Sequence, residues 1–122
     1  MNRLHRLLLT ALVAGMAFVS EVAWAHAKLQ NATPASGATL ESPPREISLH
    51  FNEKLEGAFS SVKVTTSAGQ NIGAATSHLD SVKPSILRLD LPSLKQGTYG
   101  VHWAVVGQDG HRIKGEYNFT VK

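Results

Sequence analysis

The sequence contains no cysteine, and its two methionines, Met1 and Met16, both lie near the start of the chain. The absence of cysteine excludes disulfides, thiolate nucleophiles and a blue-copper centre, since that centre needs a Cys ligand. Beyond residue 16 the chain offers no sulfur at all for Cu(I), which prefers thiolate or thioether ligands. The fold must therefore rest on an apolar core, and a metal site must use nitrogen and oxygen.

Several signatures of other protein classes are missing as well. No glycine-rich phosphate loop and no G-x-S-x-G nucleophile elbow occur in the sequence. No basic cluster with interleaved aromatic residues occurs either, so nucleic acid is not an expected partner. The 122 residues are 43% hydrophobic and 17% charged, a composition that indicates one small globular domain.

The apolar run near the start of the chain is too short to cross a bilayer. Residues 7–19 span 13 positions, whereas a membrane-spanning helix needs about 20. Arg3 and Arg6 precede the run, and Ala23-Trp24-Ala25 follows it, with small residues where signal peptidase cleaves. We therefore interpret residues 1–25 as a cleaved export signal rather than a membrane anchor. The mature protein is then residues 26–122 and begins with His26.

From His26 onward, apolar and polar residues alternate with period two, interrupted by Gly, Pro, Ser and Asn. We expect a first edge strand at about 26–30, a loop through most of 31–46, core strands near 47–51, 62–65 and 87–91, and a terminal hairpin of 99–105 and 117–121. Trp103 falls on the apolar face of this hairpin and is predicted to lie in the core. No helix is indicated. The pattern predicts an all-β fold of about seven strands, an immunoglobulin-like Greek-key sandwich or small barrel in one domain.

Histidine is the residue type that could carry chemistry here. The five histidines beyond residue 25 are His26, His50, His78, His102 and His111. His50 and His102 fall on strand faces opposite the large apolar residues, so we expect them to be exposed or partly buried. His78 lies in a polar stretch and is predicted to be a solvated loop residue. Neither kind of position indicates a ligand.

His26 becomes a special residue if the signal is cleaved after Ala25. Its free amine and the near imidazole nitrogen of the same residue can then close a chelate ring on one metal ion. The alternative is a frayed terminus, as most first residues are.

The second candidate is Asp109-Gly110-His111, in the turn of the predicted hairpin. Residues i and i+2 of extended backbone project to the same side, and Gly110 between them carries no side chain. One carboxylate and one imidazole can then converge on one ion. The alternative is an ordinary Asp-Gly turn with a solvated histidine. Taken together with His26, however, the set offers three nitrogens and one oxygen, the tetragonal environment that Cu(II) prefers.

Beyond residue 25, the sequence resembles the CopC (PcoC) family of periplasmic copper-binding proteins. The resemblance rests on "HAKL" directly after the signal, "TPASGATL", "ISLHFNEKLEGAFSSVKV" and "GTYGVHWAVVGQDGHRIKGEYNFTVK", in this order and spacing. It implies a cupredoxin-like Greek-key β-sandwich, a periplasmic location, and one Cu(II) per chain held by His26, Asp109 and His111.

The same resemblance carries over one more residue and one departure. It implies that Glu53, in "FNE", lies close to the Cu(II) site as an outer partner or weak ligand, although the sequence alone would make it a surface charge. Many members also hold Cu(I) in a methionine-rich loop, and the matching stretch "SAGQNIGAATSHLDSVKPS" contains no methionine. We therefore expect a protein of the Cu(II)-only type.

The expected function is the buffering or delivery of Cu(II) in copper homeostasis or resistance, without catalysis. We expect a monomer that is not membrane-embedded after cleavage, and the family implies an inner-membrane copper transporter of the CopD type as partner. Two alternatives stay open. A copper held by an N-terminal histidine is also similar to the histidine brace of polysaccharide monooxygenases, and a plain immunoglobulin-like assembly module would need no metal.

Overall fold

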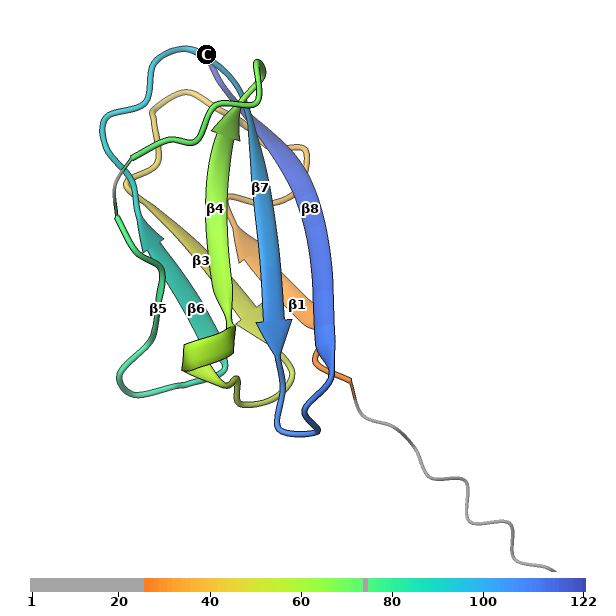
Figure 1. Ribbon diagram of the computed structural model, residues 1–122. Coiled ribbons are helices and arrows are strands. Elements are labelled where there is room, and N and C mark those ends of the chain that lie inside the picture. Colours follow the sequence, from red (N-terminus) through yellow and green to blue (C-terminus); the bar gives the residue numbers. More distant parts are fainter. Residues whose placement is uncertain (1–25, 74) are drawn as a thin grey trace, which may run out of the picture.

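Two four-stranded β-sheets pack face to face (Figure 1). The structure, a computed structural model, describes residues 26–73 and 75–122. One sheet has the strand order β1-β3-β6-β5. Its strands are β1 (Leu29–Thr33), β3 (Glu46–Phe51), β6 (Ile86–Asp90) and β5 (His78–Leu79). The other sheet has the order β2-β8-β7-β4. Its strands are β2 (Thr39–Leu40), β8 (Arg112–Val121), β7 (Gly97–Val106) and β4 (Ser61–Thr66).

The prediction of an all-β Greek-key sandwich is confirmed. Its helical content, within the residues described, is one short 3-10 turn, η1 (Gly57–Phe59). The structure has eight strands rather than about seven, because β2 and β5 have only two residues each. Two residues are too few for an alternating pattern to be visible in the sequence. Within the described residues, no helix is long and apolar enough to cross a membrane.

Three local predictions differ from the structure. The first edge strand begins at Leu29 rather than at residue 26. The segment 31–46, expected to be mostly loop, contains β2, which pairs in parallel with the end of β8. His78 is exposed as predicted, but it belongs to β5 and pairs with Arg88 rather than lying in a loop. For β2, the pairing comes from a strand far along the sequence, whereas β5 pairs with β6, the next strand of the chain.

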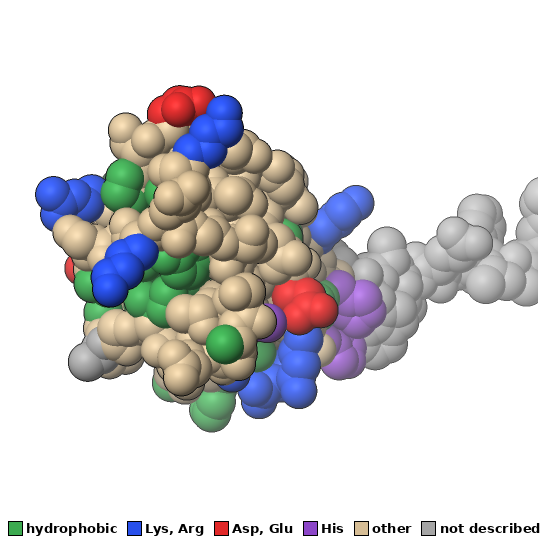
Figure 2. Space-filling model, turned by 90° about the horizontal axis from the view of Figure 1, so that it is seen from above, with side chains coloured by type: hydrophobic (Ala, Val, Ile, Leu, Met, Phe, Trp, Pro, Cys, Tyr) green, Lys and Arg blue, Asp and Glu red, His purple; other side chains and the backbone are tan. Residues whose placement is uncertain are grey.

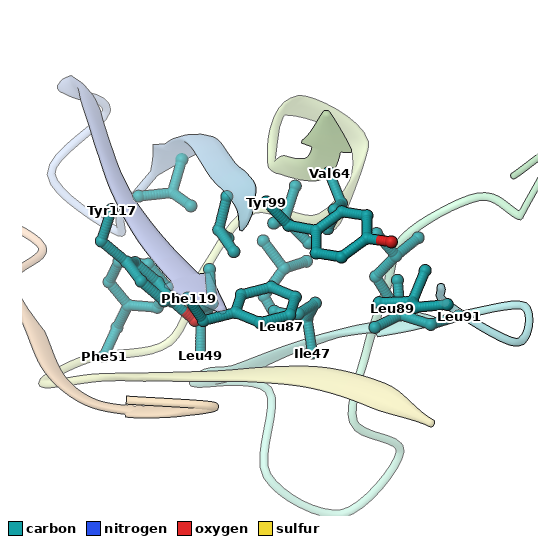
Figure 3. Packing of buried hydrophobic residues seen from close by; sticks show 14 of the residues in the cluster. Ile47, Leu49, Phe51, Val64, Leu87, Leu89, Leu91, Tyr99, Tyr117 and Phe119 are labelled. Atoms are coloured by element: carbon teal, nitrogen blue, oxygen red, sulfur yellow. The ribbon is translucent and has the colours of Figure 1, made fainter. Parts of the chain in front are cut away.

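The core lies between the inner faces of the two sheets (Figure 3). The alternation predicted its members correctly for the main strands. Ile47, Leu49, Leu87, Val101 and Val105 are fully buried. The ring of Tyr99 stacks on that of Phe119, with 5.5 Å between centroids.

Trp103, predicted to lie in the core, is only partly buried. It pairs across the strands with Gly115, and a Cβ at Gly115 would overlap the indole ring. The ring therefore lies over bare backbone near the end of the hairpin, and its centroid is 6.1 Å from that of Tyr117. The alternation of apolar and polar residues predicted the correct face of β7 for Trp103 but not how deeply its side chain is buried.

The outer face of the β1-β3-β6-β5 sheet carries a charge network around Arg88. The guanidinium donates to Glu46 Oε1 at 2.6 Å and to Asp80 Oδ1 at 2.9 Å. Asp80 also accepts from the backbone N–H groups of Lys83 and Val82. These bonds, that from Lys83 first and that from Arg88 next, lower the pKa of Asp80 to about 2. The charges of this face are thus compensated within the face.

The long β7-β8 hairpin determines at which end of the sandwich the candidate metal ligands lie. Its ladder runs from Gly97 opposite Val121 to Val106 opposite Arg112. The turn that joins the two strands therefore projects from one end of the sandwich, and the start of the described chain lies at the same end (Figure 1).

A matched pair of substitutions tests this account of the core. Val64 is 1% exposed and Val82 is 82% exposed, so Val64→Ala and Val82→Ala remove the same atoms from opposite environments. We expect Val64→Ala to lower the free energy of unfolding by about 2 kcal/mol. Val82→Ala should change it by less than about 0.5 kcal/mol. Urea unfolding measures both, and equal effects would contradict the assignment of the core.

Candidate metal centre

The start of the described chain is held against the end of β3. Ala27 is buried, at 2% exposure, although it lies only one residue after His26. Asn52, directly after β3, accepts the N–H of Lys28 on Oδ1 at 2.7 Å, and its own N–H donates to the Lys28 carbonyl at 3.0 Å. Its Nδ2 also donates to the His26 carbonyl at 3.4 Å. His26 therefore sits on an anchored segment rather than on a frayed one.

The second part of the site is the turn between β7 and β8. The N–H of Gly110 donates to the Gly107 carbonyl at 3.1 Å, and Gly110 has φ +79°, a left-handed conformation that favours glycine. Asp109 Oδ1 accepts the backbone N–H of His111 at 3.0 Å. This bond folds the aspartate side chain back over the turn, where its second oxygen points to the ring of His111.

The turn and the start of the chain converge at Asp109. Its Oδ2 lies 3.1 Å from His111 Nδ1 and 3.2 Å from His26 Nδ1. The two imidazole rings meet edge to face, with centroids 4.8 Å apart. Figure 2 shows histidine side chains gathered beside the start of the described chain. Two histidines from opposite ends of the described chain thus share one carboxylate oxygen of Asp109, which is 83 positions from His26 in the sequence.

The geometry suits one small metal ion. One ligand atom from each of His26, Asp109 and His111 lies within 4.8 Å of the others, and this is the one such group of His, Asp or Glu side chains among the described residues. Ligands at right angles, each about 2.0 Å from an ion, are about 2.8 Å apart. The observed separations of 3.1 and 3.2 Å are close to this value.

The electrostatics of the turn keep the carboxylate charged. The hydrogen bond from the backbone N–H of His111 is the largest cause of a pKa of Asp109 below its usual value. Burial opposes it, and the His111 and His26 rings lower the pKa further. The side chains of His26 and His111 are 50% and 45% exposed, and that of Asp109 is 20% exposed. An ion could therefore enter from solvent and meet an anionic ligand.

Glu53 lies behind this cluster rather than in it. A methyl group at Gly107 would overlap Glu53 Oε1 and lie 3.2 Å from Ala27 Cβ, so these three residues are packed together. Glu53 Oε1 is buried and has no hydrogen-bond partner among the described residues. The sequence alone gave a surface charge here, and the structure instead shows a half-buried carboxylate with one orphaned oxygen.

The other histidines lie elsewhere and have other neighbours. His50 Nε2 is 3.1 Å from Ser48 Oγ, on the outer face of β3. His102 lies between Thr65 Oγ1, at 2.9 Å from Nε2, and Glu116 Oε2, at 3.1 Å from Nδ1. Sequence reasoning did not single out Asn52, although a polar residue directly after a core strand is a signal for such an anchor.

Comparison with known proteins identifies the family. The family model described as "CopC domain" matches residues 29–122, which is most of the chain. The chain belongs to the CopC family. The match covers both sheets and the Asp109-Gly110-His111 turn, so the family assignment rests on the whole sandwich.

Individual CopC relatives agree with this assignment. The chain is 38% identical to "Copper resistance protein C" of Pseudomonas syringae pv. tomato over 93% of both sequences. It is 40% identical to "Protein YobA" of Escherichia coli K12 over 85% of both. It also matches "Copper transport protein CutJ" of Bacillus subtilis at 28% identity, over 98% of this chain but 22% of that protein. The family's function is thus related to copper, and the Pseudomonas syringae and Bacillus subtilis relatives are named for copper resistance and copper transport rather than for a catalysed reaction.

Solved CopC structures share the sandwich. The crystal structure of CopC from Methylosinus trichosporium OB3b superposes with a TM-score of 0.75 at 33% identity, over 80% of this chain and 94% of that one. PcoC of Escherichia coli, a methionine-rich copper resistance protein, superposes with a TM-score of 0.73 at 32% identity, over 80% of this chain and 100% of that one. Unlike a methionine-rich protein, the present chain has no methionine after residue 16.

The anchoring role of Asn52 can be tested without any metal. Asn52→Ala removes the acceptor of the Lys28 N–H, so we expect faster amide hydrogen exchange at Lys28 and a loss of about 1 kcal/mol in unfolding free energy. Asn31→Ala, on the exposed side of β1, is the matched control and should leave the exchange of Lys28 unchanged. Unchanged exchange in Asn52→Ala would show that the side chain does not hold the start of the chain.

Proposed function

We propose that this protein binds one Cu(II) ion through His26, Asp109 and His111, and buffers or delivers it in the periplasm. The observation that carries the proposal is the convergence of these three side chains within 4.8 Å in a chain of the CopC family. The relatives named for copper resistance and copper transport support copper as the metal.

The ligand types favour the oxidised ion. Two imidazoles and a carboxylate are borderline and hard ligands, and Cu(II) has the highest affinity of the common divalent ions for such sets. Cu(I) would need thiolate or thioether sulfur, which residues 26–122 lack. A chain of this composition is suited to store or carry Cu(II) rather than to exchange both oxidation states between two sites.

The proposed site is completed by removal of residues 1–25, which lie outside the described residues. In the precursor the nitrogen of His26 is an amide, and an amide is a poor metal ligand. Cleavage after Ala25 converts it into an amine next to its own imidazole. The site would then have three nitrogens and one oxygen, and it would form only after export.

Glu53 is proposed as an outer partner of the site. Its orphaned oxygen lies against Gly107, two residues before Asp109, and Gly107 also lies against Ala27, the neighbour of His26. A buried carboxylate with no partner costs free energy unless something supplies a proton or a positive charge. A bound Cu(II) and the free amine of His26 would both provide such a charge nearby.

The same features weigh against a monooxygenase. A carboxylate ligand such as Asp109 would occupy a position that an oxygen-activating copper needs open. The match to a copper transport protein that is several times longer supports a different role, since it shows that a CopC-like segment exists within a transport polypeptide. We propose that the present protein acts as a monomer and exchanges copper with a membrane transporter of the CopD type.

Removal of one ligand gives the first test. His111→Ala should weaken Cu(II) binding more than about 100-fold. Removal of a residue that only hydrogen-bonds to a metal ligand already lowers metal affinity by about 10- to 100-fold, and removal of the ligand itself should lower it further. His78→Ala, an exposed histidine outside the cluster, is the control and should bind as the unchanged protein does. A competition titration with a chelator of known affinity measures both. Equal affinities would refute the ligand assignment.

A second test concerns the free amine. One glycine added before His26 converts the amine to an amide and moves the charge away from the imidazole, so we expect a loss of affinity of the same order as in His111→Ala. A glycine added after Lys122 is the control for the added residue. If both extended proteins bind Cu(II) equally well, the amine is not a ligand, whatever the role of the side chains.

A further inference from the structure

The outer face of the β4-β7-β8 part of the second sheet is hollowed. The hollow has a volume of about 550 Å³ and is lined by residues of β4, β7 and β8 and by the segment 75–77 beside β4. The Val62 N–H donates to Ser77 Oγ at 3.1 Å, which fixes that segment along the free side of β4. We call this hollow the cationic groove, for the charges described next.

Three positively charged side chains line the cationic groove, namely Lys63, Arg112 and Lys114, and no carboxylate lines it. None of the three takes part in the ion pairs found among the described residues. Glu116 is two residues beyond Lys114 on β8 and does not line the groove, and its Oε2 lies 3.1 Å from His102 Nδ1. The side chains that line the groove therefore carry a net positive charge.

The opposite face of the sandwich differs in this respect. There Arg88 is bonded to two carboxylates, Glu46 and Asp80, so that its charge is satisfied within the face. A groove lined by three cationic side chains and by no carboxylate suits an anionic ligand. The groove also adjoins the candidate metal centre, because Arg112 directly follows His111.

The spacing of the cations suits an extended chain rather than a compact anion. Arg112 and Lys114 are alternate residues of β8, so their side chains leave the same face about 7 Å apart. Lys63 lies two strands away and two residues further along the sheet than Lys114, at a distance of about 12 Å. Alternate side chains of an extended peptide repeat at the same 7 Å or so. Between the strands, Ala104 pairs with Ser61 and Lys114 and provides a small, flat floor.

We propose that the cationic groove binds an extended acidic segment of a partner protein, with carboxylates at alternate positions. Arg112 and Lys114 pair with successive carboxylates along β8, and Lys63 receives a charge from the other side of the segment. Because the groove borders the metal centre, a partner bound there lies beside the copper ligands. The binding itself requires no metal, so it can hold or fail independently of the proposed function.

The structure provides its own reporter for this binding. Trp103 lies between the groove residues His102 and Ala104 of β7, with its indole on the opposite face of the strand, over Gly115. It is the only tryptophan of residues 26–122, which contain both sheets and the whole described core. In the experiment, metal-free protein of residues 26–122 is titrated with a synthetic peptide of alternating glutamate and serine. Binding is followed by tryptophan fluorescence. A peptide with glutamine in place of glutamate is the matched control, and free citrate tests for a small-anion site.

We expect saturable binding of the glutamate peptide that weakens with added salt, and no binding of the glutamine peptide. Lys114→Glu should weaken binding by about tenfold, because it replaces an attraction with a repulsion. Lys95→Glu makes the same change of charge outside the groove and should alter the affinity by less than about twofold. The proposal is overturned by absence of saturable binding, by equal losses in both variants, or by citrate binding as tightly as the peptide.

Discussion

The pairing of β7 with β8 is the constraint on which the other features of this molecule depend. Ten residues of each strand are in register, from Gly97 opposite Val121 to Val106 opposite Arg112. Because the side-chain period of a strand is two residues, a slip of one residue would exchange its inner and outer faces. The register that buries Tyr117 and Phe119 therefore also exposes Arg112 and Lys114. The core, the turn and the cationic groove are set by one ladder.

The metal centre adds a second constraint, since one of its residues comes from the far end of the sequence. The ladder alone positions Asp109 and His111. His26 reaches them because Ala27 is buried and Asn52 holds the next peptide by two short hydrogen bonds. The hairpin ladder and the anchored chain start together explain how a half-exposed site is kept in place without a disulfide. It is assembled from a tight hairpin turn and an anchored chain start, each stabilised by backbone hydrogen bonds.

Much of this could be predicted from the sequence, for a physical reason in each case. Alternation identifies strands that face a core on one side, so the main strands and their buried residues were found. It does not reveal two-residue strands such as β2, and it does not show how deeply the Trp103 side chain is buried. The approach of His26 to Asp109 could not follow from local pattern, because it depends on which strand ends meet, and the expectation there came from family resemblance. The orphaned oxygen of Glu53 was likewise not visible in the sequence.

The cationic groove is the feature that could least be predicted from the sequence, because its charged residues are far apart along the chain. Along the sequence, the small excess of Lys and Arg is spread out, with Lys63 about fifty residues from Arg112 and Lys114. Only the antiparallel order β4-β7-β8 brings them to one face, while the same folding gives Arg88 two carboxylate partners on the other face. A small net positive charge that is spread along the sequence is thus concentrated on one face of the folded chain. Since β8 begins one residue after His111, any partner attracted by that charge approaches the molecule next to the metal ligands.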